Sequence, residues 1–196
     1  REPLVEVAPD DAQRFGLTDG GFARVSTPWG DAAYRVAVTD GQHGGEIFVP
    51  MHWTDLTGSG RTGRLMHPAV DPVSGQPGFK NVAAAIAAVT TDWRGFLVTR
   101  EPVRPGSLFW ALARVEGGWL TELAGTGAVD VDALLPAGIR SEAADKAQGM
   151  TRITVRAEDG VLAAVLYLTR SGSLPDRDWV TRQFVAEDAS AIELLA

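Results

Sequence analysis

The first half of the chain alternates hydrophobic and polar positions in short runs separated by Gly, Pro and Asp, a pattern typical of strands with one buried face. The series begins at residues 4–7, and Pro9, Asp10 and Asp11 followed by Gly16 predict a short helix directly after them. The pattern predicts four further strands, at residues 22–27, 32–38, 47–50 and 81–89. The last run is rich in Ala and Val without a clear period, and we interpret it as the strand that closes the sheet.

The pattern changes around residues 90–95, where a loop-rich half gives way to new alternating strands. It predicts five strands, at residues 96–100, 109–115, 119–124, 151–157 and 161–168, with a polar, Gly-interrupted segment between the third and the fourth. It also predicts three helices, at residues 130–135, 175–184 and 189–195. Strands followed by helices favour an α+β layer. We therefore expect two domains, residues 1–92 and 93–196, in a chain that is mainly β plus α+β.

The polar loop after the predicted strand 47–50 carries the densest group of candidate ligand-binding residues. An apolar strand runs directly into His52, Trp53 and Thr54, and successive side chains at the mouth of a strand can point into one cavity. Each residue alone is more often structural, because a histidine beside a strand end readily bonds to carbonyls and a tryptophan is usually in the core. Their adjacency, with Lys80 further along, favours a large polar ligand that carries phosphates and a heterocycle.

Charge and cysteine content exclude several classes of function. The net charge of −7 argues against nucleic acid or an anionic membrane as a partner. The absence of Cys excludes disulfides, thiolate metal ligands, iron–sulfur ligation and a thiol nucleophile. No apolar run reaches the roughly 18 to 20 residues of a membrane span and no signal segment opens the chain, so we expect a cytoplasmic location. The chain begins with Arg1, and we expect it to be a piece of a longer polypeptide.

Three motifs of catalytic or nucleotide-binding sites fail on spacing. No Ser lies in the Gly-x-Ser-x-Gly elbow of serine hydrolases. The histidines His43, His52 and His67 are not three or four residues apart, as helical ligand pairs are, and no acid is placed to complete a metal set. The glycine-rich stretch that begins at Gly58 lacks the Gly-Lys-Ser/Thr ending of a phosphate loop. We therefore expect no catalytic residue and no metal ligand within this chain.

Four motifs in order resemble a known family. They are the predicted helix PDDAQRFGL, the strand GFARVSTPWG, the segment VPMHWTD at the start of the polar loop, and DPVSGQPGFK at its end. Together they resemble the C-terminal dinucleotide-binding domain of the molybdopterin oxidoreductases, and most closely that of the cytoplasmic assimilatory nitrate reductases. The resemblance covers about the first 90 residues. It implies a six-stranded double-psi β-barrel domain, followed here by a smaller α+β layer domain.

The resemblance also implies a cofactor, bis-(molybdopterin guanine dinucleotide) with molybdenum, and the residues that bind it. Carried over by position, these residues are His52, Trp53, Thr54, Gln76, Pro77 and Lys80, and Ser59 is a further candidate among the polar donors of the loop. The first three would line the cofactor, and the last three would hold its distal side, with Lys80 near pterin or phosphate oxygens. Ser59 stands in the part of the loop where many relatives place an Asn. An iron–sulfur cluster and the molybdenum ligand would lie elsewhere in the parent chain.

Residues 93–196 resemble, more faintly, the segment that follows this barrel in assimilatory nitrate reductases, through FLVTREP, WALARVEGGW and LYLTRSGSLPDRDW. Because formate dehydrogenases commonly lack it, this segment favours reduction of nitrate to nitrite by the parent enzyme, with the fragment alone inactive. The partners implied are upstream domains of the parent chain and an iron–sulfur or flavoprotein electron donor, which residues 93–196 would help to dock. Two alternatives remain open: another molybdopterin oxidoreductase, such as a formate dehydrogenase, or a non-catalytic binding or interaction module.

Overall fold

The computed structural model describes residues 2–78, 80–147 and 149–186. They form two compact units, Arg1–Thr90 and Thr91–Ala196, each with its own sheet and its own buried core. The sequence pattern placed the boundary between residues 92 and 93. The second unit is the longer of the two, where the resemblance implied a smaller domain, and its polar segment before residue 150 forms a further strand.

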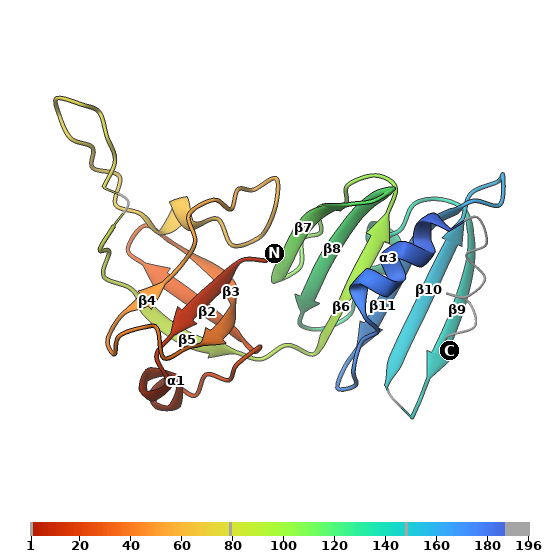
Figure 1. Ribbon diagram of the computed structural model, residues 1–196, viewed down its shortest axis with the longest axis horizontal. Helices are drawn as coiled ribbons and strands as arrows, with labels where there is room; N and C mark the ends of the chain where they lie inside the picture. The colour runs from red at the N-terminus through yellow and green to blue at the C-terminus, as the bar shows by residue number, and fades with distance from the viewer. Residues whose placement is uncertain (1, 79, 148, 187–196) are drawn as a thin grey trace. The chain divides into compact units, whose positions relative to one another are not determined.

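The first unit is built on one five-stranded sheet (Figure 1). Its strands are β1 (Leu4–Val7), β2 (Phe22–Thr27), β3 (Gly30–Val38), β4 (Ile47–Phe48) and β5 (Ala85–Val89), in the order β4-β1-β3-β2-β5. β1 and β3 run parallel, with Val5 opposite Val36, and every other pair in this sheet is antiparallel. A parallel pair requires a crossover, and the chain from β1 to β3 passes through α1 (Pro9–Phe15) and β2.

Local sequence accounts for the boundaries of α1. Pro9 stands in the first turn, where a backbone N–H has no partner in the helix, and Asp10 and Asp11 place negative charge at the positive end of the helix dipole. The helix stops at Gly16, whose φ of 64° lies in the left-handed region that glycine adopts without strain. The helix contributes to the same core as the fully buried Tyr34 and the valines of β1 and β3.

Two predicted strands are shorter than expected, and over the described residues this sheet has five strands where the resemblance implied six. β4 ends at Phe48, and Pro50 beyond it offers no N–H to a ladder. β5 begins only at Ala85, where its pairing with Ser26 of β2 starts, and Asn81, with a φ of 61°, lies outside the extended conformation. The polar loop contains a short 3₁₀ helix, η1 (Thr62–Leu65), that the pattern did not predict.

The second unit is a six-stranded antiparallel sheet with a helix on one face (Figure 1). Its strands are β6 (Trp93–Thr99), β7 (Phe109–Val115), β8 (Gly118–Gly125), β9 (Ile139–Asp145), β10 (Met150–Arg156) and β11 (Leu162–Thr169), in the order β7-β8-β6-β11-β10-β9. The helix α3 (Arg177–Val185) packs Val180 and Phe184 against Phe96 and Tyr167. The loop that contains α2 (Val131–Leu134) covers a second apolar cluster. The chain is therefore mainly β, with an α+β arrangement in this unit, as expected.

The strand β9 was missed, because its residues were interpreted as part of a polar, Gly-interrupted segment. It forms one edge of the sheet, pairs with β10, and exposes most of its side chains. A strand without a buried face shows no hydrophobic alternation, so periodicity could not reveal it. The helix predicted at residues 189–195 lies outside the described residues.

Candidate functional site

A cavity of about 1130 Å³ opens in the first unit between α1, the chain that leaves β4 and the segment that enters β5. Its wall carries cationic, acidic and apolar side chains, among them Arg14, Lys80, Asp11, Glu46, Phe15, Phe48, Met51 and Leu65. Sites for drug-sized ligands commonly measure about 300 to 1,000 Å³, so this cavity has room for a larger molecule. A wall of mixed character suits a ligand with both charged and planar parts.

One side of the cavity is set by a buried carboxylate on α1. Asp11 is 8% exposed, and its Oδ2 accepts a hydrogen bond of 2.6 Å from the backbone N–H of Gly45. This bond ties the turn before β4 to the helix and so fixes the part of the wall that carries Glu46. Arg14 and Phe15 line the cavity from the last turn of α1, with the Arg14 guanidinium 5.3 Å from the centre of the Phe15 ring. The helix thus presents a cation beside an aromatic surface.

The chain that leaves β4 forms the mouth of the cavity, where Pro50, Met51 and His52 all line the wall and His52 is exposed. The Oγ1 of Thr62, on η1, donates a hydrogen bond of 2.7 Å to the carbonyl oxygen of Pro50. The phenol oxygen of Tyr34 lies 3.5 Å from the same Oγ1. Burial raises the pKa of Tyr34, and the hydrogen bond with Thr62 acts weakly in the other direction.

Lys80 and Asn81 line the cavity from the segment that enters β5. Both side chains are exposed, so the ammonium of Lys80 is accessible to a ligand. Asn81 adopts a left-handed φ of 61°, a conformation that Asn tolerates better than most residues. The turn at Asn81 directs the chain along the cavity before it joins the sheet at β5.

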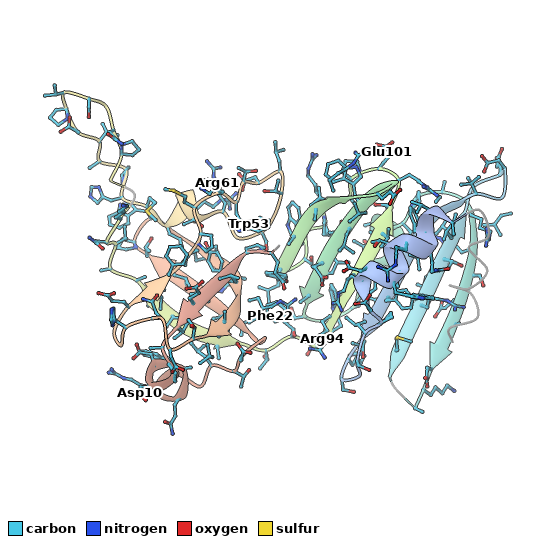
Figure 2. All side chains as sticks on the ribbon, viewed as in Figure 1. Asp10, Phe22, Trp53, Arg61, Arg94 and Glu101 are labelled. Carbon is cyan, nitrogen blue, oxygen red and sulfur yellow. The ribbon has the colours of Figure 1, made fainter. Side chains whose placement is uncertain are left out.

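The sequence predicted one hollow shared by residues 52–54 and Lys80, and of these His52 and Lys80 lie on the wall of this cavity. Trp53 follows His52 but is not part of the wall. It is half-buried on the long loop, on the side of the unit away from Asp10 of α1 (Figure 2). Ser59 is half-buried further along the same loop and also lies outside the wall. The structure therefore brings together two of the residues predicted at the strand end and loop, and leaves the others apart.

The long loop after β4 satisfies many of its own polar groups. The carbonyl of Thr54 accepts a backbone bond of 3.0 Å from Thr57, and the two hydroxyls lie 3.3 Å apart, so the predicted ligand-binding group of Thr54 is used within a turn. Asp55 accepts hydrogen bonds of 2.6 Å from Arg61 and 3.2 Å from Arg64. The bond from Arg61 is the main reason that the pKa of Asp55 is lowered. The two arginines are thereby engaged by a carboxylate of this chain.

In the sequence, Gln76 and Pro77 lie between η1 and β5. This segment forms a hairpin-like turn that extends away from the sheet (Figure 1). Val70 and Pro77 form an isolated antiparallel bridge, and the N–H of Asp71 donates a bond of 2.9 Å to the carbonyl of Gln76. Neither Gln76 nor Pro77 belongs to the cavity wall. A role for these two residues in holding the distal side of a cofactor stays a prediction.

Sequence reasoning missed Arg14, Thr62 and Asn81 as parts of this site. Arg14 stands in the last turn of a helix, where a cation is already explained by the helix dipole. Asn81 precedes the run assigned to the last strand, and an Asn at such a position could have indicated a left-handed turn. Thr62 depends on how the loop folds back on the end of β4, and no local pattern reports that.

Within the described residues, no group of three or more His, Asp or Glu side chains is placed to hold a metal ion. No helix in that part of the chain has both the length and the apolar composition needed to span a membrane.

Comparison with known proteins relates the first unit to a family. Residues 1–83 match the family described as Molydopterin dinucleotide binding domain. The chain is 45% identical over 126 residues to a nitrate reductase of Klebsiella oxytoca, in an alignment that covers 63% of this chain and 14% of that protein. It is 27% identical over 88 residues to the assimilatory nitrate reductase catalytic subunit of Bacillus subtilis (strain 168), covering 45% of this chain and 12% of that subunit.

A formate dehydrogenase is about as similar to this chain as the Bacillus subtilis subunit is. The chain is 28% identical over 88 residues to the F420-dependent formate dehydrogenase 1 subunit alpha of Methanococcus maripaludis, covering 45% of this chain and 12% of that subunit. The chain spans 12 to 14% of the length of these three relatives. The matched residues 1–83 include Arg14, His52 and Lys80 of the cavity wall. The resemblance stated from the sequence is therefore confirmed: residues 1–83 match the molybdopterin dinucleotide-binding domain, and 126 residues of the chain are similar to a nitrate reductase.

Proposed function

We propose that this chain is the C-terminal part of a molybdenum-dependent nitrate reductase and that its first unit binds bis-(molybdopterin guanine dinucleotide). The observation that carries the proposal is the cavity that joins His52 and Lys80 within the region matching the dinucleotide-binding family. The relative with 45% identity is a nitrate reductase. When bound, the molybdenum of this cofactor supplies two-electron oxygen transfer, and the residues of this chain bind and orient the cofactor.

The donors on the cavity wall fit such a cofactor. Phosphate oxygens would accept charge-assisted hydrogen bonds from the ammonium of Lys80 and the guanidinium of Arg14. A planar heterocycle would find aromatic surface at Phe15 and Phe48, which are 42% and 51% exposed. The carboxylate of Asp11, which would repel phosphate, is engaged by a backbone N–H. We assign His52 to the same role, as a planar group at the mouth of the cavity.

The remaining parts of the proposal concern fold and context. We assign the first unit to the double-psi β-barrels, and the support is the parallel pairing of β1 with β3 inside an otherwise antiparallel sheet. The parent enzyme would be cytoplasmic, would contain an iron–sulfur cluster outside this chain, and would receive electrons from an iron–sulfur or flavoprotein donor. The second unit would contribute to docking that donor.

Binding of guanosine diphosphate, which represents the nucleotide portion of the cofactor, tests the site in this chain. We expect Lys80→Ala to weaken binding about tenfold, because a charge-assisted hydrogen bond contributes roughly 1.5 to 3 kcal/mol and 1.4 kcal/mol is a factor of ten. Isothermal titration calorimetry measures the dissociation constant directly.

The sequence offers a matched control, since Lys80 and Lys146 are its two lysines and Lys146 lies in the second unit. Lys146→Ala removes the same charge away from the cavity and should bind the nucleotide as the unaltered chain does. Equal weakening by both substitutions would mean that net charge, and not the cavity, controls binding. No binding to the unaltered chain would overturn the proposed site.

A formate dehydrogenase is the second candidate, because one of the relatives at 28% identity is of that kind. The intact polypeptide that carries this chain distinguishes the two activities. A nitrate reductase would oxidise reduced viologen when nitrate is added and would release nitrite, whereas a formate dehydrogenase would reduce viologen with formate. Turnover with formate alone would replace the nitrate assignment and leave the cofactor assignment intact.

A further inference from the structure

Thr62 closes the base of the loop that carries His52. Its Oγ1 donates a hydrogen bond of 2.7 Å to the carbonyl oxygen of Pro50, a residue 12 positions earlier in the sequence. Thr62 is 1% exposed, so this bond is protected from competition with bulk water. Both partners lie on the wall of the cavity, next to Met51 and His52. The bond therefore acts where the chain turns from the sheet into the loop.

The backbone at Pro50 is not held by the sheet. The ladder between β1 and β4 consists of the pairs Glu6 with Phe48 and Val7 with Ile47, so it ends before Pro50. Pro50 has no N–H to donate, and its carbonyl lies beyond the last ladder pair. Val49 packs against the core, and the bond from Thr62 to Pro50 then constrains the direction in which the chain leaves β4. His52 follows two residues later, so its position depends on the direction of the backbone at Pro50.

A buried phenol supports the threonine. The oxygen of Tyr34 lies 3.5 Å from Oγ1 of Thr62. Because the single hydroxyl proton of Thr62 is directed to Pro50, the phenol of Tyr34 is the donor in this contact. Burial raises the pKa of Tyr34, so the phenol keeps its proton at neutral pH. A Cβ on Gly60 would lie 2.9 Å from Cε1 of Tyr34, so the loop packs directly on this ring.

We propose that Thr62 is a positioning residue of the cofactor cavity, and that its bond to Pro50, here named the hydroxyl clasp, fixes the orientation of His52 at the mouth. The part of this inference that concerns ligand affinity rests on the proposed function, whereas the part that concerns His52 does not. The clasp joins two positions 12 residues apart, with the first part of the polar loop between them. It makes the cavity mouth pre-formed, which lowers the ordering cost of binding.

Thr62→Val tests the clasp, because valine has the shape of threonine and lacks its hydroxyl. We expect the amide signals of Met51 and His52 and the imidazole signals of His52 to shift and broaden in two-dimensional NMR spectra, and guanosine diphosphate to bind at least fivefold more weakly. Thr62→Ser keeps the hydroxyl and should restore both properties to within twofold of the unaltered chain.

Thr154→Val is the matched control, since Thr154 is also 1% exposed and lies on β10 in the second unit. It should leave the signals of Met51 and His52 and the nucleotide affinity unchanged, whatever it does to stability. If Thr62→Val leaves these signals as they are in the unaltered chain, the clasp is overturned. If Thr62→Val moves them while the unaltered chain binds no nucleotide, the clasp stands and the proposed function fails.

A measurement on the unaltered chain covers the case in which Thr62→Val does not fold. A hydroxyl proton held in a buried hydrogen bond exchanges slowly with solvent, and the deuterium isotope effect on the Cβ resonance of Thr62 then gives two resolved signals in mixed water. Two signals for Thr62 and one averaged signal for the exposed Thr54 would support the clasp. A single averaged signal for Thr62 would overturn it.

Discussion

Buried threonines in the second unit differ in whether their hydroxyl is used. Thr99 is 2% exposed and donates a hydrogen bond of 2.7 Å to the carbonyl of Glu101. Thr121 is fully buried, and its Oγ1 makes no hydrogen bond with the described residues. The strands β6 and β8 that carry them are neighbours, and the two side chains lie on the same face of the sheet. The two hydroxyls are therefore similarly buried but should contribute to the free energy of unfolding with opposite signs.

Thr121→Val should raise the free energy of unfolding by about 1 kcal/mol, because the substitution removes a buried hydroxyl without a partner and keeps the side-chain shape. Thr99→Val should lower it by a similar amount, since the carbonyl of Glu101 loses its donor. Chemical denaturation followed by tryptophan fluorescence measures both changes. A destabilised Thr121→Val chain would reveal a hydrogen bond of Thr121 in solution and contradict the prediction.

Whether a polar side chain is already hydrogen-bonded within the chain also decides which predicted site residues are available to a ligand. The sequence predicted that residues 52–54 and Lys80 share a hollow, and the structure places His52 and Lys80 on the wall of one cavity but not Trp53 or Thr54. Thr54 has the composition of a ligand-binding residue but uses its polar groups in a turn with Thr57. Thr62 contacts the carbonyl of Pro50 only because the loop returns to the sheet. The sequence shows which side chains are polar, but the hydrogen-bond partner of each one depends on the tertiary structure.

At the scale of elements, the pattern of hydrophobic positions predicted strands that bury at least one face and missed the strand that buries neither. β7 matches its predicted range, residues 109–115, and buries four residues in succession. β9 is exposed along its length and was missed, whereas β4 is only two residues long where four were expected. α3 was predicted from its first turn, and the ion pair of Arg177 with Glu122 at 2.8 Å fastens it to β8. Tertiary pairing decides the edge strands β4 and β9, whereas the edge strand β7 follows its local pattern.

The hairpin-like turn between η1 and β5 should loosen in acid. The carboxylate of Asp71 accepts backbone bonds of 2.7 Å from Ser74 and 3.0 Å from Val73, and the bonds from Ser74 are the main cause of a pKa below its ordinary value of 3.8. The ionised carboxylate therefore stabilises the turn at pH values above 3.8, and this contribution is lost as the pH falls through the lower folded-state pKa.

A carbon-detected NMR titration of Asp71 measures this directly, and the amide signals of Val73 and Ser74 should move with the same midpoint. Asp71→Asn keeps an acceptor and removes the charge, so these amides should no longer respond to pH between 2 and 4. Titration of Asp71 at or above the ordinary value for an aspartate would contradict the bonds that form this turn.

At the scale of the whole chain, the family could be predicted from four motifs, whereas the arrangement of the cavity could not. The motifs report residue order within residues 1–83, which is where the family match lies. The cavity is formed by α1, the end of β4 and the segment before β5, which are far apart in sequence. The residues of its wall belong to the first unit.

The last prediction follows from the position of the cavity wall within the first unit. Guanosine diphosphate added to the chain should shift the amide signals of Arg14, Met51, His52 and Asn81, because these residues line the cavity from three separate segments. The signals of β6 and β11, at the centre of the second sheet, should not move. A two-dimensional NMR titration of the labelled chain measures both sets at once, with adenosine diphosphate as the test of base preference. Shifts of equal size in the two units would place binding outside this cavity, whereas shifts confined to the first unit in all three segments would locate it there.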